Sequence, residues 1–172
     1  MRRSVQSAWE AERALSAAVA QYSLDAAKEY LATLEDLPGD WPVSASLARF
    51  GWAEMPPRIL RRFVVKIKIA HLGHEIDGKP SACWVWMHNT TRKGYGKFFL
   101  GFVDGQKVEG ACHRIAFEHW IGFLPAGWIV DHQCNTKTCC NPAHLWPETN
   151  ENNIKLAWQR APWKIRNQYS KD

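Results

Sequence analysis

The spacing of apolar residues predicts a helical segment at the start of the chain. Apolar side chains recur every three or four residues over 4–22, as in an amphipathic helix. A second helix is expected to begin at the N-cap Ser23 and to end before the Pro38 turn, and a short third helix is expected over 44–50. We therefore expect residues 1–57 to form a helical appendage.

Residues 58–70 carry two periodicities at once. Ile59, Phe63 and Ile67 recur at helical spacing, whereas Val65, Ile67 and Ile69 alternate with lysines as in a strand. This pattern favours a helix that runs into a strand.

Beyond residue 83 the pattern changes to short apolar runs separated by turn residues. Asp104-Gly105 is typical of a hairpin turn. The runs predict strands over 83–86, 97–103 and 128–132, and helices over 113–121 and 150–160. This mixture indicates an α+β fold.

The composition is that of a globular protein. The 172 residues are 46% hydrophobic and 23% charged, which is about one domain's worth and excludes a fully disordered chain. Every apolar run is too short to span a bilayer, and the two arginines at the start precede no apolar stretch of signal-peptide length. We therefore expect a soluble cytoplasmic protein in a reducing compartment, with no membrane partner.

The net charge of +5 is unevenly distributed. Residues 1–57 carry five basic and eight acidic side chains (−3), and residues 58–172 carry 17 basic and nine acidic side chains (+8). A basic surplus confined to one region is typical of polyanion binding, although a solvated basic face explains the charge equally well.

The five cysteines favour a metal site over disulfides, because their number is odd and no export signal is present. Cys134, Cys139 and His144 follow the spacing C-x4-C-x4-H, which suits three corners of a tetrahedral zinc site in an otherwise weakly apolar loop. The alternative is a set of ordinary buried thiols. Cys140 would point away from such an ion, and the spacing leaves two upstream cysteines, Cys83 and Cys112, open as the fourth ligand.

Asp131 and His132 end an apolar run, and Asn153 falls in the first turn of the last predicted helix. A strand-end imidazole can take a proton from water. Oxygen ligands such as Asp and Asn can hold a hard cation that neutralises charge on a phosphate. The arrangement suits metal-assisted phosphodiester hydrolysis, although a structural histidine and a helix cap explain the same residues one by one.

These residues resemble a known family. The stretch DHQCNTKTCCNPAHLWPETNENN (131–153) is similar to the core of HNH, or ββα-metal (His-Me finger), endonucleases, and most similar to His-Cys box homing endonucleases and phage HNH endonucleases. CWVW (83–86), GYGKF (94–98), HRIAFE (113–118) and LPAGWIVDH (124–132) are also similar to phage members.

The resemblance implies roles for the central residues. His132 is expected to be the general base, and Asn153, with Asp131, to hold one catalytic Mg²⁺ or Mn²⁺ ion. Asn141 is expected to shape the loop and the base histidine. One structural zinc per chain is implied, and the family's upstream fourth ligand favours Cys83, so the set is Cys83, Cys134, Cys139 and His144.

The resemblance is weaker for phosphate contacts. Arg114 matches a family arginine that follows a histidine, here His113, and both are expected to contact phosphate. The family's scissile-phosphate arginine has no clear match, and Lys97 is the nearest candidate.

We therefore predict a helical appendage (1–57), a basic connector (58–80) and a zinc-stapled HNH nuclease domain (81–172). The expected function is metal-dependent cleavage of double-stranded DNA, in the manner of a homing or phage-encoded HNH endonuclease. The alternative is a non-catalytic, zinc-stapled DNA-binding module or a phage accessory protein. A homodimer, and a protein partner bound through residues 1–57, are left open.

Overall fold

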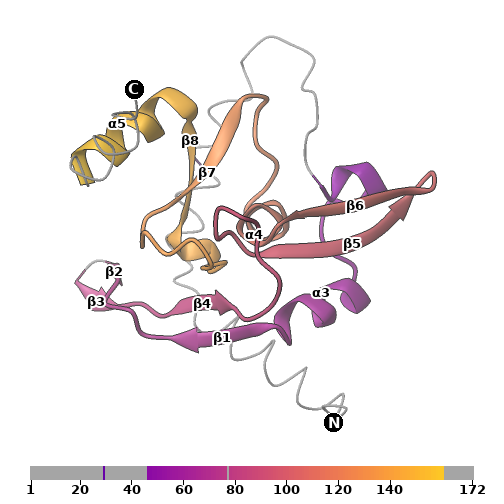
Figure 1. The fold of residues 1–172 in the computed structure, drawn as a ribbon, viewed down its shortest axis with the longest axis horizontal. Coiled ribbons are helices and arrows are strands. Elements are labelled where there is room, and N and C mark those ends of the chain that lie inside the picture. Colours follow the sequence, from indigo (N-terminus) through magenta and orange to yellow (C-terminus); the bar gives the residue numbers. More distant parts are fainter. Residues whose placement is uncertain (1–28, 30–45, 77, 161–172) are drawn as a thin grey trace.

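The computed structural model describes residue 29, residues 46–76 and residues 78–160. Within 46–160 the fold is α+β, with three α-helices and four two-stranded antiparallel sheets (Figure 1). Apart from Glu29, which is helical, the helices predicted before residue 44 lie outside the described residues. None of the described helices combines the length and apolar character that crossing a membrane requires.

Most of the predicted elements are confirmed. The helices are α3 (Pro57–Val64), α4 (Cys112–Trp120) and α5 (Asn150–Arg160), with 3₁₀ turns η1 (Ala48–Phe50) and η2 (Pro142–His144). The paired strands are β1 (Ile67–Ala70) with β4 (Cys83–Trp86), β2 (Glu75–Ile76) with β3 (Lys79–Pro80), β5 (Lys97–Val103) with β6 (Gln106–Ala111), and β7 (Trp128–His132) with β8 (Leu145–Thr149). Residues 58–70 do form a helix that runs into a strand.

Strand β8 is an element that the sequence pattern did not predict. It contains Pro147, which lies opposite Val130 of β7. Proline cannot donate a hydrogen bond to a strand ladder, so it argues against a strand when only the sequence is read. Both strands of a two-stranded sheet are edges, however, and an edge position tolerates proline.

The hydrophobic core lies between α3, α4 and the strands β4–β6. Phe63 of α3 is fully buried, with ring centroids 5.2 Å from both Trp86 and Phe98. Ile115 and Phe117 of α4 are also fully buried in the same cluster. Part of the predicted connector therefore packs into the same core as the residues that follow it.

Glu118 ties the start of the described chain to α4. Its carboxylate accepts hydrogen bonds from the backbone N–H groups of Ser46 (3.1 Å) and Leu47 (3.0 Å). Burial raises the pKa of Glu118, and the two N–H donors oppose part of that increase. These bonds hold η1 against the core.

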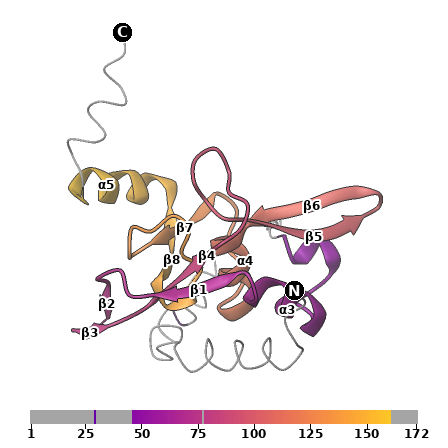
Figure 2. The ribbon, with the colours of Figure 1, turned by 60° about the horizontal axis from the view of Figure 1, so that its bottom comes forward.

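Strands β7 and β8 and helix α5 form a ββα unit, which confirms the predicted ββα core. The loop 133–144 connects the two strands, and α5 follows β8 on the side of the molecule away from the β5–β6 hairpin (Figures 1 and 2). The hydroxyl of Thr149 caps α5 by accepting from the N–H of Asn152 at 3.2 Å.

The loop 133–144 is fastened to strand β4. The N–H of Cys140 donates to the carbonyl of Trp84, and the N–H of Trp86 donates to the carbonyl of Thr138, both at 2.9 Å. Val85 and Cys139 form an isolated antiparallel bridge. The first residue of β4, Cys83, is therefore brought beside the loop, 51 residues ahead of Cys134 in the sequence.

Candidate metal centre and active site

Four side chains that could ligate a metal ion meet between β4 and the loop 133–144. The ligand atoms of Cys83, Cys134, Cys139 and His144 all lie within 4.8 Å of one another. Cys83, Cys139 and His144 are buried, and Cys134 is half-buried. Of the two upstream cysteines, the structure brings Cys83 to this group, whereas Cys112 lies in the hydrophobic core.

The distances in this group fit a tetrahedral zinc ion. The Sγ atoms of Cys83 and Cys139 each lie 3.6 Å from Nδ1 of His144. Thiolate and imidazole ligands about 2.0–2.3 Å from a tetrahedral ion are themselves separated by roughly 3.6 Å. Three soft sulfurs and one imidazole are also the donors that structural zinc prefers.

Neighbouring groups orient the ligands. The Nε2 atom of His144 lies 2.8 Å from the hydroxyl of Ser81, so a proton on Nε2 leaves Nδ1 available for a metal. The buried side chain of Asn141 donates to the carbonyl of Ala82 (2.8 Å) and accepts from the N–H of Ala143 (3.0 Å). The N–H of Asn141 also points at Sγ of Cys139, at 3.5 Å. The side chain of Asn141 therefore stabilises the loop 133–144.

The thiols in this group cannot all ionise together without a cation. Hydrogen bonding from Cys139 and His144 lowers the pKa of Cys134 to about 3. The interaction with Cys134 and burial raise the pKa of Cys139, and burial raises that of Cys83. A divalent ion would stabilise three adjacent thiolates, and the donor set therefore fits zinc.

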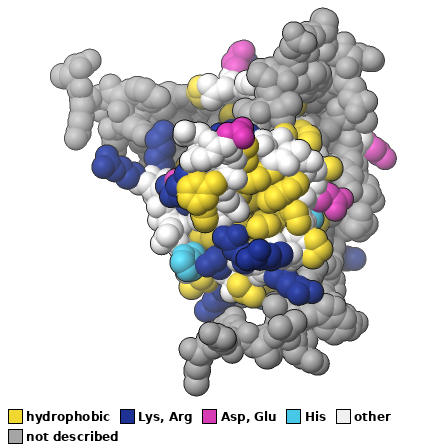
Figure 3. Space-filling model, turned by 90° about the vertical axis from the view of Figure 1, so that its right-hand side faces the viewer, with side chains coloured by type: hydrophobic (Ala, Val, Ile, Leu, Met, Phe, Trp, Pro, Cys, Tyr) yellow, Lys and Arg dark blue, Asp and Glu magenta, His cyan; other side chains and the backbone are white. Residues whose placement is uncertain are grey.

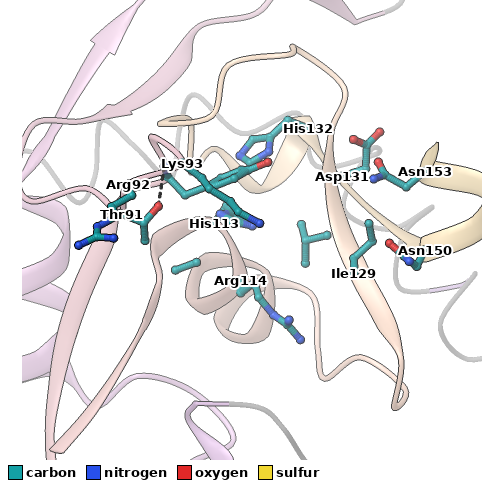
Figure 4. Close-up of a pocket in the computed structure, with 13 residues that line it drawn as sticks. Thr91, Arg92, Lys93, His113, Arg114, Ile129, Asp131, His132, Asn150 and Asn153 are labelled. Carbon is teal, nitrogen blue, oxygen red and sulfur yellow. Dashed lines mark hydrogen bonds between the residues drawn. The ribbon is translucent and has the colours of Figure 1, made fainter. Parts of the chain in front are cut away.

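An open cleft of about 700 Å³ lies next to the metal group. Its lining comes from the loop before β5, the start of α4, strand β7 and the start of α5. In Figure 4, Asp131 and Asn153 lie next to each other at one end, and Thr91 and Arg92 lie at the other. Arg114 is on the same wall as His113.

His132 stands at the end of β7 with its ring fixed in the cleft. Its Nε2 atom lies 3.0 Å from the carbonyl oxygen of Cys139. A carbonyl only accepts hydrogen bonds, so Nε2 carries the proton and Nδ1 of the neutral ring keeps its lone pair. Burial lowers the pKa of His132, and the hydrogen bond to Cys139 opposes part of that shift. The ring is therefore a base rather than a cation at neutral pH.

Two further rings flank His132. The His113 ring centroid is 4.5 Å away and the Tyr95 centroid is 5.9 Å away, and Tyr95 lies 5.2 Å from His113. The ammonium of Lys137 sits 5.6 Å from the Tyr95 ring and donates to the carbonyl of Lys93 at 3.2 Å. These contacts pack the loop before β5 against the loop 133–144.

The structure places most of the predicted residues in the cleft. Asp131, His132 and Asn153 line it, and so do His113 and Arg114. Lys97 does not line it, and its ammonium instead forms an ion pair with Glu109 on the neighbouring strand.

Five polar lining residues were not predicted from the sequence as site residues: Thr91, Arg92, Lys93, Tyr95 and Asn150. The cations Arg92 and Lys93 sit in an exposed turn, and only their position opposite β7 distinguishes them from any solvated lysine or arginine. The sequence predicted the strand over 128–132, but it did not show that this strand faces the turn at Arg92 and Lys93.

A second basic surface lies outside the cleft. Figure 3 shows Lys and Arg side chains in a row beside exposed hydrophobic side chains, on the side of the molecule where α3 and the β5–β6 hairpin lie. Arg58 and Arg61 of α3 are exposed, and Arg62 donates to the carbonyl of Phe99 at 3.0 Å. Among the described residues no carboxylate forms an ion pair with these arginines.

The fold and the cleft define a ββα protein with a histidine, an acid and an amide gathered beside a Cys₃His group. Residues 111–153 match the sequence model of a family described as HNH endonuclease. The chain is 34% identical over 68 residues to the uncharacterized gene 5.3 protein of Enterobacteria phage T3. The matched stretch covers 38% of this chain and 67% of that protein. The chain belongs to the HNH endonuclease family.

Other relatives match a similar length of chain. Protein 2.8 of Escherichia phage T7 is 38% identical over 65 residues, which is 38% of this chain and 41% of that protein. Protein 7.7 of the same phage is 34% identical over 71 residues, which is 41% of this chain and 51% of that protein. The match therefore spans only about half the length of these two relatives.

A solved structure described as "DNA binding and cleavage by the HNH homing endonuclease I-HmuI" is also similar. It has a TM-score of 0.40 and 19% sequence identity, over 61% of this chain and 60% of that chain.

Proposed function

We propose that this protein is a metal-dependent endonuclease that hydrolyses phosphodiester bonds in double-stranded DNA. The observation that carries the proposal is the fixed tautomer of His132 in a cleft that also contains Asp131, Asn153 and Arg114. A binding-only module has no need of an oriented base beside a pair of oxygen ligands.

His132 performs the proton transfer in this proposal. Its Nδ1 lone pair accepts a proton from the water that attacks phosphorus, while the carbonyl of Cys139 holds Nε2–H and keeps the ring in one orientation. The P–O bond to the leaving oxygen breaks, and that oxygen takes up a proton from solvent. The imidazolium returns its own proton to solvent through the open side of the cleft.

Asp131 and Asn153 supply oxygen atoms from β7 and α5 that suit a hard cation (Figure 4). Mg²⁺ or Mn²⁺ bound there would neutralise charge on the phosphate and on the leaving oxygen. Arg92, Lys93 and Arg114 line the same cleft, and in this proposal their cationic groups contact the remaining phosphate oxygens. The +8 charge of residues 58–172 favours DNA as the polyanion.

The Cys₃His group has a separate, structural role. Cys83, Cys134, Cys139 and His144 would occupy all four positions of one zinc ion, which leaves no place for water or phosphate. Cys139 links the two sites, because its Sγ belongs to the metal group and its carbonyl oxygen holds His132. The loop 133–144 thus orients the base without taking part in the chemistry.

The test is cleavage of supercoiled plasmid in the presence of Mg²⁺. His132→Ala should lower the rate by roughly 10²–10⁴-fold, the usual contribution of a general base, while zinc content and DNA affinity stay close to those of the parent. His88→Ala removes an exposed histidine outside the cleft and should cut like the parent. If His132→Ala cuts at the parent rate, this cleft is not the nuclease site and a zinc-stapled DNA-binding module becomes the better explanation.

Asn153→Ala separates the cation site from the base. It should also lose activity, and raised Mg²⁺ or Mn²⁺ should partly restore it, whereas the same treatment should not rescue His132→Ala. The matched control is Asn152→Ala, which removes the same group from the adjacent, exposed position on α5. Full activity of Asn153→Ala at low Mg²⁺ would show that Asn153 does not bind the catalytic cation.

A further inference from the structure

Two histidines lie side by side at the centre of the cleft, and the mechanism above uses only one of them. His113 is the second residue of α4 and its ring centroid is 4.5 Å from that of His132. In Figure 4 the His113 ring lies between His132 and Arg114. Only 8% of His113 is exposed, so very little of its ring is open to solvent.

The burial of His113 decides which ring nitrogen carries the proton. Its Nδ1 atom is enclosed and has no hydrogen-bond partner among the described residues, and the residue itself lines the cleft. A buried N–H without a partner is rarer than a buried lone pair without one. The neutral ring is therefore expected to keep its lone pair on Nδ1 and its proton on Nε2.

We propose that His113 donates a hydrogen bond from Nε2–H to a non-bridging oxygen of the phosphate that is attacked. This inference rests on the proposed function and assigns a substrate contact within it. His132 presents a lone pair to water and His113 presents a proton to phosphate, so the two adjacent imidazoles have opposite polarity. The contact is neutral, in contrast to that of Arg114 on the same wall.

The environment keeps His113 in the neutral form that the proposal requires. Burial, the adjacent His132 and Arg114 together lower the pKa of His113 to about 3. A second positive charge 4.5 Å from the His132 ring would oppose formation of the imidazolium on the base. A neutral donor avoids this repulsion, because it retains its N–H without carrying a charge.

The first test compares His113→Phe with His113→Gln. Phe keeps an aromatic ring between Tyr95 and His132 but has no donor, whereas the Gln amide can place an N–H close to the position of Nε2. His113→Phe should lower kcat by about 10- to 100-fold at saturating DNA, the value of one hydrogen bond to a charged group, and His113→Gln should recover part of the loss. His71→Phe, at an exposed position, should cut like the parent.

A stereochemical readout separates contact from packing. One phosphorothioate diastereomer at the cleaved position should slow the parent, and His113→Phe should lose most of that added slowing because the contact to that oxygen is already absent. Parent-like cutting by His113→Phe, or an unchanged thio effect, would overturn the proposal and leave His113 a packing role only.

The second test does not depend on activity. Long-range ¹H–¹⁵N spectra of the full chain should show the His113 proton on Nε2 and not on Nδ1. Addition of a DNA duplex with Ca²⁺, chosen so that the duplex stays intact, should shift the Nε2–H signal. A proton on Nδ1, or a signal that DNA does not move, would overturn the phosphate contact. Absence of cleavage by the parent would instead count against the proposed function.

Discussion

The aromatic core around α3 and α4 and the metal loop 133–144 are stabilised in different ways. In the core, Phe63, Ile115 and Phe117 are fully buried and contact other apolar side chains. In the loop, the fully buried side chains include Asn141 and His144, and hydrogen bonds and the four candidate metal ligands hold the chain. Hydrophobic burial stabilises the core without any ligand. The close approach of three thiols and an imidazole, in contrast, is favourable only when a cation binds between them.

This contrast has a functional consequence. The proposed general base, His132, depends on the loop for its orientation, through the carbonyl of Cys139, and on the core side for its neighbours His113 and Tyr95. The cleft therefore lies where the two regions meet. Substitutions in either region should therefore affect the cleft. Those in the loop should act through loss of zinc, and those in the core through a lower free energy of unfolding.

The largest effect is expected from the metal group. Cys139→Ser should remove the zinc and unfold residues 133–144, because structural zinc contributes about 10–16 kcal/mol of apparent binding energy in small zinc modules. Zinc stoichiometry and hydrogen exchange across residues 128–149, which include the loop and both strands, measure this loss. Cys140→Ser alters the adjacent thiol, which lies outside the group and faces the carbonyl of Trp84 at 3.2 Å, and should keep the zinc. Full zinc content in Cys139→Ser would contradict the assignment.

The next effect tests the core alone. Phe63→Ala should lower the free energy of unfolding by about 3–5 kcal/mol, the usual cost of removing a fully buried phenyl ring, while the folded protein keeps its zinc. Denaturant titration together with metal analysis measures both quantities. Phe102→Ala deletes the same ring from the hairpin, where it is 66% exposed, and should change stability by less than about 0.5 kcal/mol. Loss of zinc from folded Phe63→Ala would mean that the two regions are not separable.

A smaller change tests the polar support of the loop. Asn141→Ala removes two side-chain hydrogen bonds, one to the carbonyl of Ala82 and one from the N–H of Ala143, and both of these neighbours are buried. We expect a loss of about 1–3 kcal/mol of stability and a 10- to 100-fold weaker affinity for zinc. Competition with a zinc chelator measures the affinity. An unchanged affinity would show that the four ligands alone determine the shape of the loop.

The smallest expected effect concerns pH and belongs to the core side. His119 accepts a hydrogen bond from the N–H of Met55 at 3.1 Å, and burial lowers its pKa, with Glu54 opposing part of the shift. Below about pH 6.5 the unfolded chain therefore binds a proton that the folded chain does not, and stability should fall as the pH drops. His119→Asn keeps an acceptor for Met55 but cannot titrate.

Unfolding free energies of both proteins between pH 7.5 and 5.5 measure the difference. The slope of unfolding free energy against pH should be smaller in His119→Asn than in the parent. Equal slopes in the two proteins would remove His119 from the pH dependence of stability.

The amino-acid sequence by itself determined what depends on neighbours in the chain. The helix over 150–160 followed from the local pattern of residues. The C-x4-C-x4-H pattern placed Cys134, Cys139 and His144 together because a short loop cannot separate them far. Asp131 and His132 were recognisable because they end an apolar run.

Only the tertiary structure decided the contacts between distant segments. Cys83 rather than Cys112 joins the metal group because backbone hydrogen bonds hold β4 against the loop, and spacing alone favoured neither cysteine. Strand β8 was missed because Pro147 obscures it, and Arg92, Lys93 and Tyr95 acquire meaning only from the strand that faces them. The tautomer of His132 and the orphaned nitrogen of His113 likewise depend on packing between elements, which no local pattern of residues encodes.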